Sequence, residues 1–301
     1  MSRYINRKMI ESGIKVADYN IYQADKIWSR YSNDKVHIGE ELASVIRTLS
    51  KALPLSKTMR ALSIGSSAEP QFRILETAFK GGLYLLDVER AVLDIVKERI
   101  QRQKTGHVKT ILGDYKKVFL NPGRSENFLN ARLDGIKTDL ITLHHSFYYC
   151  EETMWSSLFD NLYRNILAPT GAMHAVLMTA EDDNQYTTTW LYNHFVGKFF
   201  GHRNNQDLLK FKKELEKIPL FKKAQVLSRT DHVQFFTADF EKFMAVIWMV
   251  LLHPVVHNYS PAQREEITEF VYKKFWREKR PLMQAQDHLV VYRGIDFKGL
   301  I

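Results

Sequence analysis

Four short apolar runs each end in residues that can bind a ligand or take up a proton. Gly65 ends the first run and Asp87 the second, Gly113 and Asp114 end the third, and His144 lies near the end of the fourth. Glycine lets a backbone turn sharply and a ligand approach closely. A carboxylate at a strand tip can bind both hydroxyls of a ribose, and a histidine can serve as a base near neutral pH.

The segment SIGSSAEP (63–70) joins the first run to a helical pattern. Its small residues and the free N–H groups at the helix start can receive polar ligand atoms. Serine and alanine replace later glycines of the G-x-G-x-x-G fingerprint, so a plain strand–helix turn stays an alternative. Asp87 lies 22 residues after Gly65, a spacing that favours ribose binding over its alternative, a helix cap.

The segments LGDY (112–115) and HHSFYY (144–149) follow the third and fourth runs. Asp114 can accept a hydrogen bond from an adenine amine, or can be a turn aspartate. His144 and His145 are candidate bases; the alternative is that they pack or orient a loop. Adjacent side chains on an extended segment point in opposite directions, so we expect no metal site there.

Amphipathic helical patterns alternate with these runs and predict the fold. The strand-like runs are 61–65, 83–87, 108–114, 139–146 and 172–178, with two more expected within 224–236 and 288–294. Alternating strands and helices indicate an α/β protein with a doubly wound, mostly parallel seven-stranded sheet covered by helices on both faces. In such sheets ligands bind beyond the carboxyl ends of the strands, near the point where strand order reverses.

The chain outside this core is predicted to be mainly helical. Apolar spacing indicates helices from about residue 8 to Pro54, so we expect a helical lid over 1–54 and a Rossmann-like domain over 55–301. Helical insertions are expected at about 183–217 and 238–280, whereas NPGRSENFLNARLDG (121–135) reads as irregular.

Composition favours a soluble, cytoplasmic protein. The 301 residues are 45% apolar and 26% charged, as in globular chains. The longest uncharged apolar run, 243–252, is half the ~20 residues of a membrane span, and the N-terminus lacks the apolar core of a secretory signal. The single cysteine, Cys150, excludes an intrachain disulfide. A net charge of +9 permits anionic partners, but nucleic acid is not indicated, because acidic residues interrupt the basic clusters.

The ordered motifs resemble those of the S-adenosylmethionine-dependent methyltransferases of the Rossmann-like class. ALSIGSSAEP is similar to their first motif, LYLLDVE to the second, ILGDY to the third and TDLITLHHSFYY to the fourth. The N-terminal helices, the YY pair and the long helical excursion before the last strand are loosely similar in architecture to the histamine N-methyltransferases.

The resemblance implies a cofactor, S-adenosyl-L-methionine, no metal, and a set of site residues. His144 and His145 would be catalytic, and aromatic faces that can stabilise a cation would bind the substrate, from Tyr22, Tyr31, Tyr148 and Tyr149. The cofactor would be bound by Gly65, Ser66, Ser67, Glu69, Asp87, Val88, Gly113, Asp114, Tyr115 and His144.

The expected activity is methyl transfer, by in-line displacement, to a nitrogen or oxygen of a small molecule. An RNA or protein acceptor is the first alternative, because of the basic charge. A non-catalytic cofactor-binding protein is the second, because Ser67 and Glu69 stand where the family often has glycine.

Overall fold

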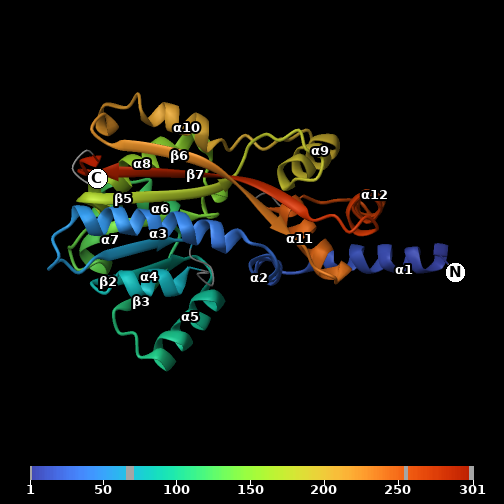
Figure 1. The fold of residues 1–301 in the computed structure, drawn as a ribbon, viewed down its shortest axis with the longest axis horizontal. Coiled ribbons are helices and arrows are strands. Elements are labelled where there is room, and N and C mark those ends of the chain that lie inside the picture. The colour runs from blue at the N-terminus through green and yellow to red at the C-terminus, as the bar shows by residue number, and fades with distance from the viewer. Residues whose placement is uncertain (1, 66–70, 254–256, 298–301) are drawn as a thin grey trace. The chain divides into compact units, whose positions relative to one another are not determined.

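A seven-stranded sheet forms the centre of the fold (Figure 1). The computed structural model describes residues 2–65, 71–253 and 257–297. The strand order is β3-β2-β1-β4-β5-β7-β6, and the four pairs from β3 to β5 are parallel. The strands are β1 (Arg60–Ile64), β2 (Gly82–Asp87), β3 (Val108–Leu112), β4 (Thr138–His144), β5 (Leu167–Met178), β6 (Gln225–Phe235) and β7 (Leu282–Arg293). The predicted fold class is confirmed.

Helices follow most strands along the chain. They are α1 (Ser2–Lys15), α2 (Ile21–Tyr31), α3 (Asp34–Ala52), α4 (Phe72–Ala78), α5 (Arg90–Gln103), α6 (Tyr115–Phe119), α7 (Pro122–Arg132), α8 (Glu152–Asn161), α9 (Thr188–Phe200), α10 (Leu208–Leu215), α11 (Phe240–Leu252) and α12 (Pro261–Val271). All of them except α6 and α7 lie in stretches that the sequence pattern predicts to be helical. None of the helices in the described ranges combines the length and the apolar character that a membrane span requires.

The stretch 121–135 was expected to be irregular, and that expectation is wrong. It contains α7, and Pro122 is the first residue of this helix. The side chain of Asn121 accepts a hydrogen bond from the Arg124 backbone N–H at 3.0 Å and so caps the helix. Proline is tolerated at the first helical position, where its missing N–H has no intrahelical partner to lose. The Asn-Pro pair therefore starts a helix here.

The chain divides into two compact units. The sheet unit comprises Ile38–Leu177, Asp207–Arg229 and the chain from Asp287. The helical unit comprises the chain up to His37 with Met178–Gln206 and Thr230–Gln286. Each unit is therefore built from segments that are separated in sequence. The boundaries between the units fall within α3, β5, β6 and β7, and most of α3 belongs to the sheet unit.

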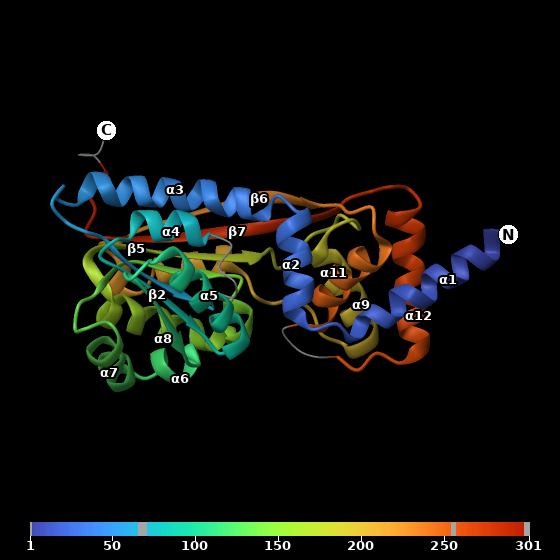
Figure 2. The same cartoon turned by 90° about the horizontal axis from the view of Figure 1, so that it is seen from below.

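Both faces of the parallel sheet are buried. Figure 2 shows α3 and α4 on one face and α6, α7 and α8 on the other. Successive strand residues alternate between the faces: Ala61 packs with Leu42 and Phe72, whereas Leu62 packs with Phe147 and the other core residues beneath α8. Strands buried on two faces need apolar residues at nearly every position, which explains the continuous apolar runs.

The helical unit gathers three segments that are distant in sequence. Helix α11 contacts α1, α2 and α9, and α12 also contacts α1. The indole N–H of Trp248 on α11 donates to the Gly13 carbonyl at 2.8 Å. A Cβ at Gly13 would lie 2.8 Å from Thr268, so α1 and α12 pack closely. The N-terminal helices thus assemble with parts of both predicted insertions; their role as a lid stays a prediction.

The core beneath α8 supports a stability prediction. Phe147 is fully buried and stacks on Trp155, with ring centroids 4.4 Å apart. We expect Phe147→Ala to lower the free energy of unfolding by about 3–5 kcal/mol, because the truncation leaves a cavity. Met154→Ala on the exposed side of α8 should change it by less than about 0.5 kcal/mol. Urea denaturation followed by circular dichroism measures both, and equal effects would contradict this packing.

Candidate functional site

The carboxyl ends of the parallel strands are held side by side by backbone hydrogen bonds. The Gly65 N–H donates to the Leu86 carbonyl at 2.8 Å, and the Gly113 N–H donates to the Asp87 carbonyl at 2.9 Å. On the other side of β1, the His145 N–H donates to the carbonyl of Val176 at 3.0 Å. Strand order reverses between β1 and β4, so the predicted ligand edge lies here.

Gly65 and Ser146 are in direct contact across this switch point. The backbone of Gly65 has φ +65°, and a Cβ built there would lie 2.2 Å from the Cβ of Ser146. Only glycine meets both requirements, since a side chain would be strained and would also overlap its neighbour. Sequence reasoning identified Gly65 but missed Ser146, for which the only signal is a small polar residue after a strand tip.

The hydroxyl of Ser146 is a buried polar group without a hydrogen-bond partner among the described residues. Its residue is only 5% exposed. A buried hydroxyl left unpaired costs about 1–3 kcal/mol, so such groups in folded proteins call for an explanation. A polar ligand atom at the switch point would supply the missing partner. This orphaned oxygen is the clearest structural indication that the edge binds a ligand.

Asp87 is 7% exposed and shapes the turn after β2. Its Oδ1 accepts from the Glu89 N–H at 2.9 Å. The cap of α5 is Glu89, whose carboxylate accepts from the Ala91 N–H at 3.2 Å, so the predicted alternative of Asp87 as helix cap does not hold. Val88 beside it is 60% exposed, an apolar surface next to a buried carboxylate.

Asp114 and Tyr115 follow β3 and both make structural contacts. Asp114 caps α6 by accepting from the Lys116 N–H at 2.9 Å. It therefore has a local structural role, which was the alternative to adenine binding. The Tyr115 hydroxyl donates to the Ser146 carbonyl at 3.0 Å. Burial raises the pKa of this hydroxyl far above its ordinary value, so it remains a donor. Their contacts with an adenine stay predictions.

The two neighbouring histidines at the end of β4, His144 and His145, contact different partners. His144 Nε2 lies 3.0 Å from Nδ1 of His174, on β5. His145 has φ +53°, its Nδ1 lies 3.3 Å from the Tyr148 hydroxyl, and the two rings stack. Throughout the described ranges, no group of three His, Cys, Asp or Glu side chains is arranged to hold a metal ion.

His174 makes a second contact, with a histidine that sequence reasoning also missed. Its Nε2 lies 3.1 Å from Nδ1 of His288, on β7. The two histidines are 114 residues apart and neither belongs to a local motif. Only the strand order, which places β4, β5 and β7 side by side, brings them to His144.

The remaining predicted residues fall into three groups. Tyr148 and Tyr149 lie in the turn directly after β4, and Tyr149 is 43% exposed. Tyr22 and Tyr31 lie on α2 in the helical unit, where the Lys242 ammonium is 5.9 Å from the Tyr31 ring centre, a cation over an aromatic face. The others, Ser66, Ser67 and Glu69, lie outside the described residues.

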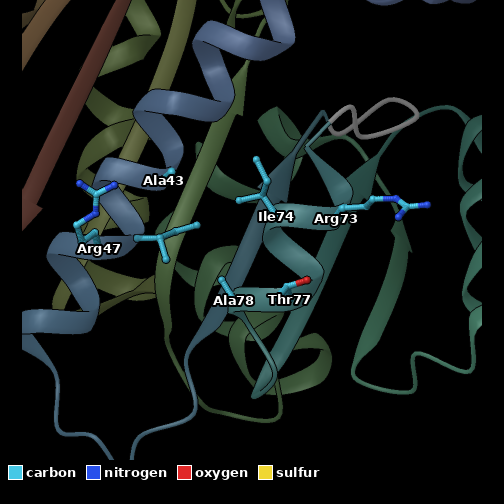
Figure 3. Close-up of a pocket in the computed structure, with 7 residues that line it drawn as sticks. Ala43, Arg47, Arg73, Ile74, Thr77 and Ala78 are labelled. Carbon is cyan, nitrogen blue, oxygen red and sulfur yellow. The ribbon is translucent and has the colours of Figure 1, made fainter.

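A separate hollow of about 450 Å³ lies between α3 and α4 (Figure 3). Its lining is Ala43, Ile46, Arg47, Arg73, Ile74, Thr77 and Ala78. None of these is a residue that we selected from the sequence, and none is a base near neutral pH. We therefore place the candidate site at the strand tips, where the orphaned hydroxyl, the buried carboxylate and the histidines lie.

Comparison with known proteins supports the fold and goes no further. The sequence matches no protein-family model and no curated protein. The YcgJ protein of Bacillus subtilis has a similar structure, with 12% identity, a TM-score of 0.51, and coverage of 85% of this chain and 97% of that one. A candidate methyltransferase of Bacillus halodurans is 14% identical over 84% of this chain and 100% of that one, with a TM-score of 0.49. A candidate sarcosine dimethylglycine methyltransferase of Galdieria sulphuraria is 13% identical over 86% of each chain, also at 0.49. At 12% identity the likeness to YcgJ shows a shared fold and nothing more.

The contact at the switch point can be tested by adding one carbon. Gly65→Ala should lower the free energy of unfolding by about 1–2 kcal/mol for its left-handed backbone and by a further ~1–3 kcal/mol for overlap with Ser146. Gly201→Ala is the matched control: Gly201 has φ +71° but nothing within 4 Å of an added Cβ, so only the first cost applies.

Ser146→Gly in the Gly65→Ala background should recover the overlap cost and leave the backbone cost. Urea denaturation of the single and double variants gives this coupling. Equal costs at positions 65 and 201, or no coupling between 65 and 146, would contradict the contact.

Proposed function

We propose that this chain is an S-adenosylmethionine-dependent methyltransferase that transfers a methyl group to a nitrogen or oxygen of a small molecule. The observation that carries the proposal is the meeting of a constricted glycine, a buried carboxylate and an orphaned hydroxyl at adjacent strand tips: Gly65, Asp87 and Ser146. An adenosyl compound with an amino-acid tail needs close backbone approach, a ribose acceptor and polar partners, which these groups can provide.

The residues present fit that cofactor. Gly65 would contact the methionine part, together with Ser66, Ser67 and Glu69, which lie outside the described residues. The Asp87 carboxylate would accept from the ribose hydroxyls, and the exposed Val88 would cover one face of the adenine. Gly113, Asp114 and Tyr115 would lie along the adenine edge. The Ser146 hydroxyl would pair with a polar atom of the ligand.

When bound, the cofactor supplies a methyl group on a positively charged sulfur, which is already a strong electrophile. The protein then has to align the acceptor with the breaking bond and exclude water, effects worth about 7–11 kcal/mol in favourable intramolecular cases. An amine acceptor must be neutral to attack, so His144 or His145 would take up its proton. The faces of Tyr148 and Tyr149 would stabilise positive charge by roughly 0.5–2 kcal/mol each.

The substrate pocket is proposed to use parts of the helical unit. A lid over residues 1–54, a substrate role for Tyr22 and Tyr31, and a substrate wall from 183–217 remain predictions from the sequence. An RNA or protein acceptor is the second candidate, favoured by the net charge of +9. Cofactor binding without transfer is the third, because the first motif lacks later glycines.

Calorimetry with S-adenosylhomocysteine tests the cofactor site. Asp87→Asn should weaken binding by roughly tenfold or more, because a hydrogen bond to a buried charge contributes about 1.5–3 kcal/mol. Asp94→Asn is the matched control: Asp94 is an exposed carboxylate on α5 that pairs with Lys97 at 2.7 Å, and its loss should leave binding unchanged.

No binding by the native chain, or equal binding by the native chain and Asp87→Asn, would contradict the proposal. Methyl transfer from labelled cofactor then separates the acceptors. Incorporation into amines or phenols supports the small-molecule activity, and incorporation into RNA or protein supports the second candidate. Binding with transfer to none of them would leave a cofactor-binding protein.

A further inference from the structure

Three histidines form a continuous hydrogen-bonded row across the sheet unit, from the strand tips into the core. His144, His174 and His288 come from β4, β5 and β7, which are neighbours in the sheet. The N···N distances are 3.0 and 3.1 Å. His174 and His288 are 0% exposed, whereas His144 is half-buried at the edge where the ligand is expected.

Burial keeps the middle ring uncharged. It lowers the pKa of His174 well below its ordinary value, and the neighbouring rings of His144 and His288 and the Arg229 guanidinium act in the same direction. Arg229, on β6, is itself paired with Glu41 of α3 at 3.0 Å. A neutral imidazole has one N–H and one lone pair. His174 must therefore donate one of its two hydrogen bonds and accept the other, so the row has a single direction.

Only one direction of the row allows His144 to work as a base. If His144 Nε2–H donates to His174, the His144 lone pair is on Nδ1, and that nitrogen can take up a proton while the row stays unchanged. If instead His174 donates to His144, a proton taken up by His144 would place two N–H groups face to face. Both hydrogen bonds would then have to reverse, which is costly because His174 and His288 are fully buried.

We propose that His174 and His288 are positioning residues that hold His144 in its Nε2–H form, so that Nδ1 is the proton acceptor of the site. This inference rests on the proposed function for the source of the proton. The N–H or O–H bond of the methyl acceptor breaks, its electron pair stays on that nitrogen or oxygen, and the proton bonds to His144 Nδ1. The resulting imidazolium donates through Nε2 to His174 in a charge-assisted hydrogen bond.

The row is unsuited to two other roles. It does not act as a metal site, because its four contacting nitrogens are engaged with one another in a line. It does not carry the proton inward, because burial and Arg229 both disfavour a positive charge on His174. The charge stays on His144, the one member of the row with access to solvent.

Nitrogen-15 NMR of imidazole-labelled protein reads the tautomer and titration of each ring without any need for activity. In the native chain we expect neutral His144 to carry its proton on Nε2, and His174 to remain neutral from pH 5 to 9. In His174→Phe the His144 imidazolium loses its acceptor, so the midpoint of its titration should fall by about one pH unit. His174→Asn, whose side-chain oxygen can accept, should recover part of that shift.

His107→Phe is the matched control. His107 is a partly buried histidine of the sheet unit that bonds the Glu76 carbonyl through Nε2 at 2.9 Å, outside the row. Its replacement should leave the His144 titration unchanged. His288→Phe should raise the share of the other His144 tautomer, because His174 then loses a partner that helps to fix which of its nitrogens donates.

Neutral His144 with its proton on Nδ1 in the native chain would overturn the proposal. This measurement uses the native protein and does not depend on whether any variant folds. An unchanged His144 midpoint in folded His174→Phe would overturn it as well. Neither result depends on the cofactor. Failure of S-adenosylhomocysteine to bind would instead contradict the proposed function, whereas the tautomer of His144 read by NMR would still show whether the row has the inferred direction.

Discussion

Burial of the parallel strands on both faces is the constraint on which the rest of this structure depends. Strands β2, β1, β4 and β5 each supply buried side chains to the cores on both faces, so their length must be filled mainly with apolar side chains. Polar chemistry is then confined to the ends of the strands. Because the strands are parallel, their carboxyl ends meet at one edge, which brings together residues that are far apart in sequence.

Buried polar groups lie at both ends of the sheet, and at the amino end the Thr138 hydroxyl and Arg60 Nε also lack a partner among the described residues. At the amino end, Asp139 is fully buried but accepts from the Arg60 N–H at 2.9 Å and from the Lys57 ammonium, so the protein satisfies its charge internally. At the carboxyl end, the Ser146 hydroxyl is buried with no partner among the described residues. A satisfied buried group stabilises a fold, whereas an unsatisfied one at a switch point indicates a ligand.

The histidine row extends the same principle. Burying an imidazole is tolerated when each ring nitrogen has a partner, and the row supplies partners from neighbouring strands. The row also couples the core to the candidate site, because the protonation of its buried members limits which nitrogen of His144 is a base. The same two hydrogen bonds thus give the buried rings their partners and influence which nitrogen of His144 can accept a proton.

The local sequence determined where the strands end, because apolar periodicity, glycine and turn-forming residues fix the backbone over only a few residues. Gly65, Asp87 and the HHSFYY segment were identifiable on that basis, and so was the α/β class. The start of β7 was not, since the buried Gln284 and Gln286 interrupt the apolar pattern; Gln284 Nε2 donates to Gln286 Oε1 at 3.1 Å, and its own Oε1 accepts from the Thr188 hydroxyl at 3.3 Å. The partners of His144 and the overlap of Gly65 with Ser146 were decided by tertiary structure. Such contacts depend on strand order and sheet spacing, which no short-range pattern encodes.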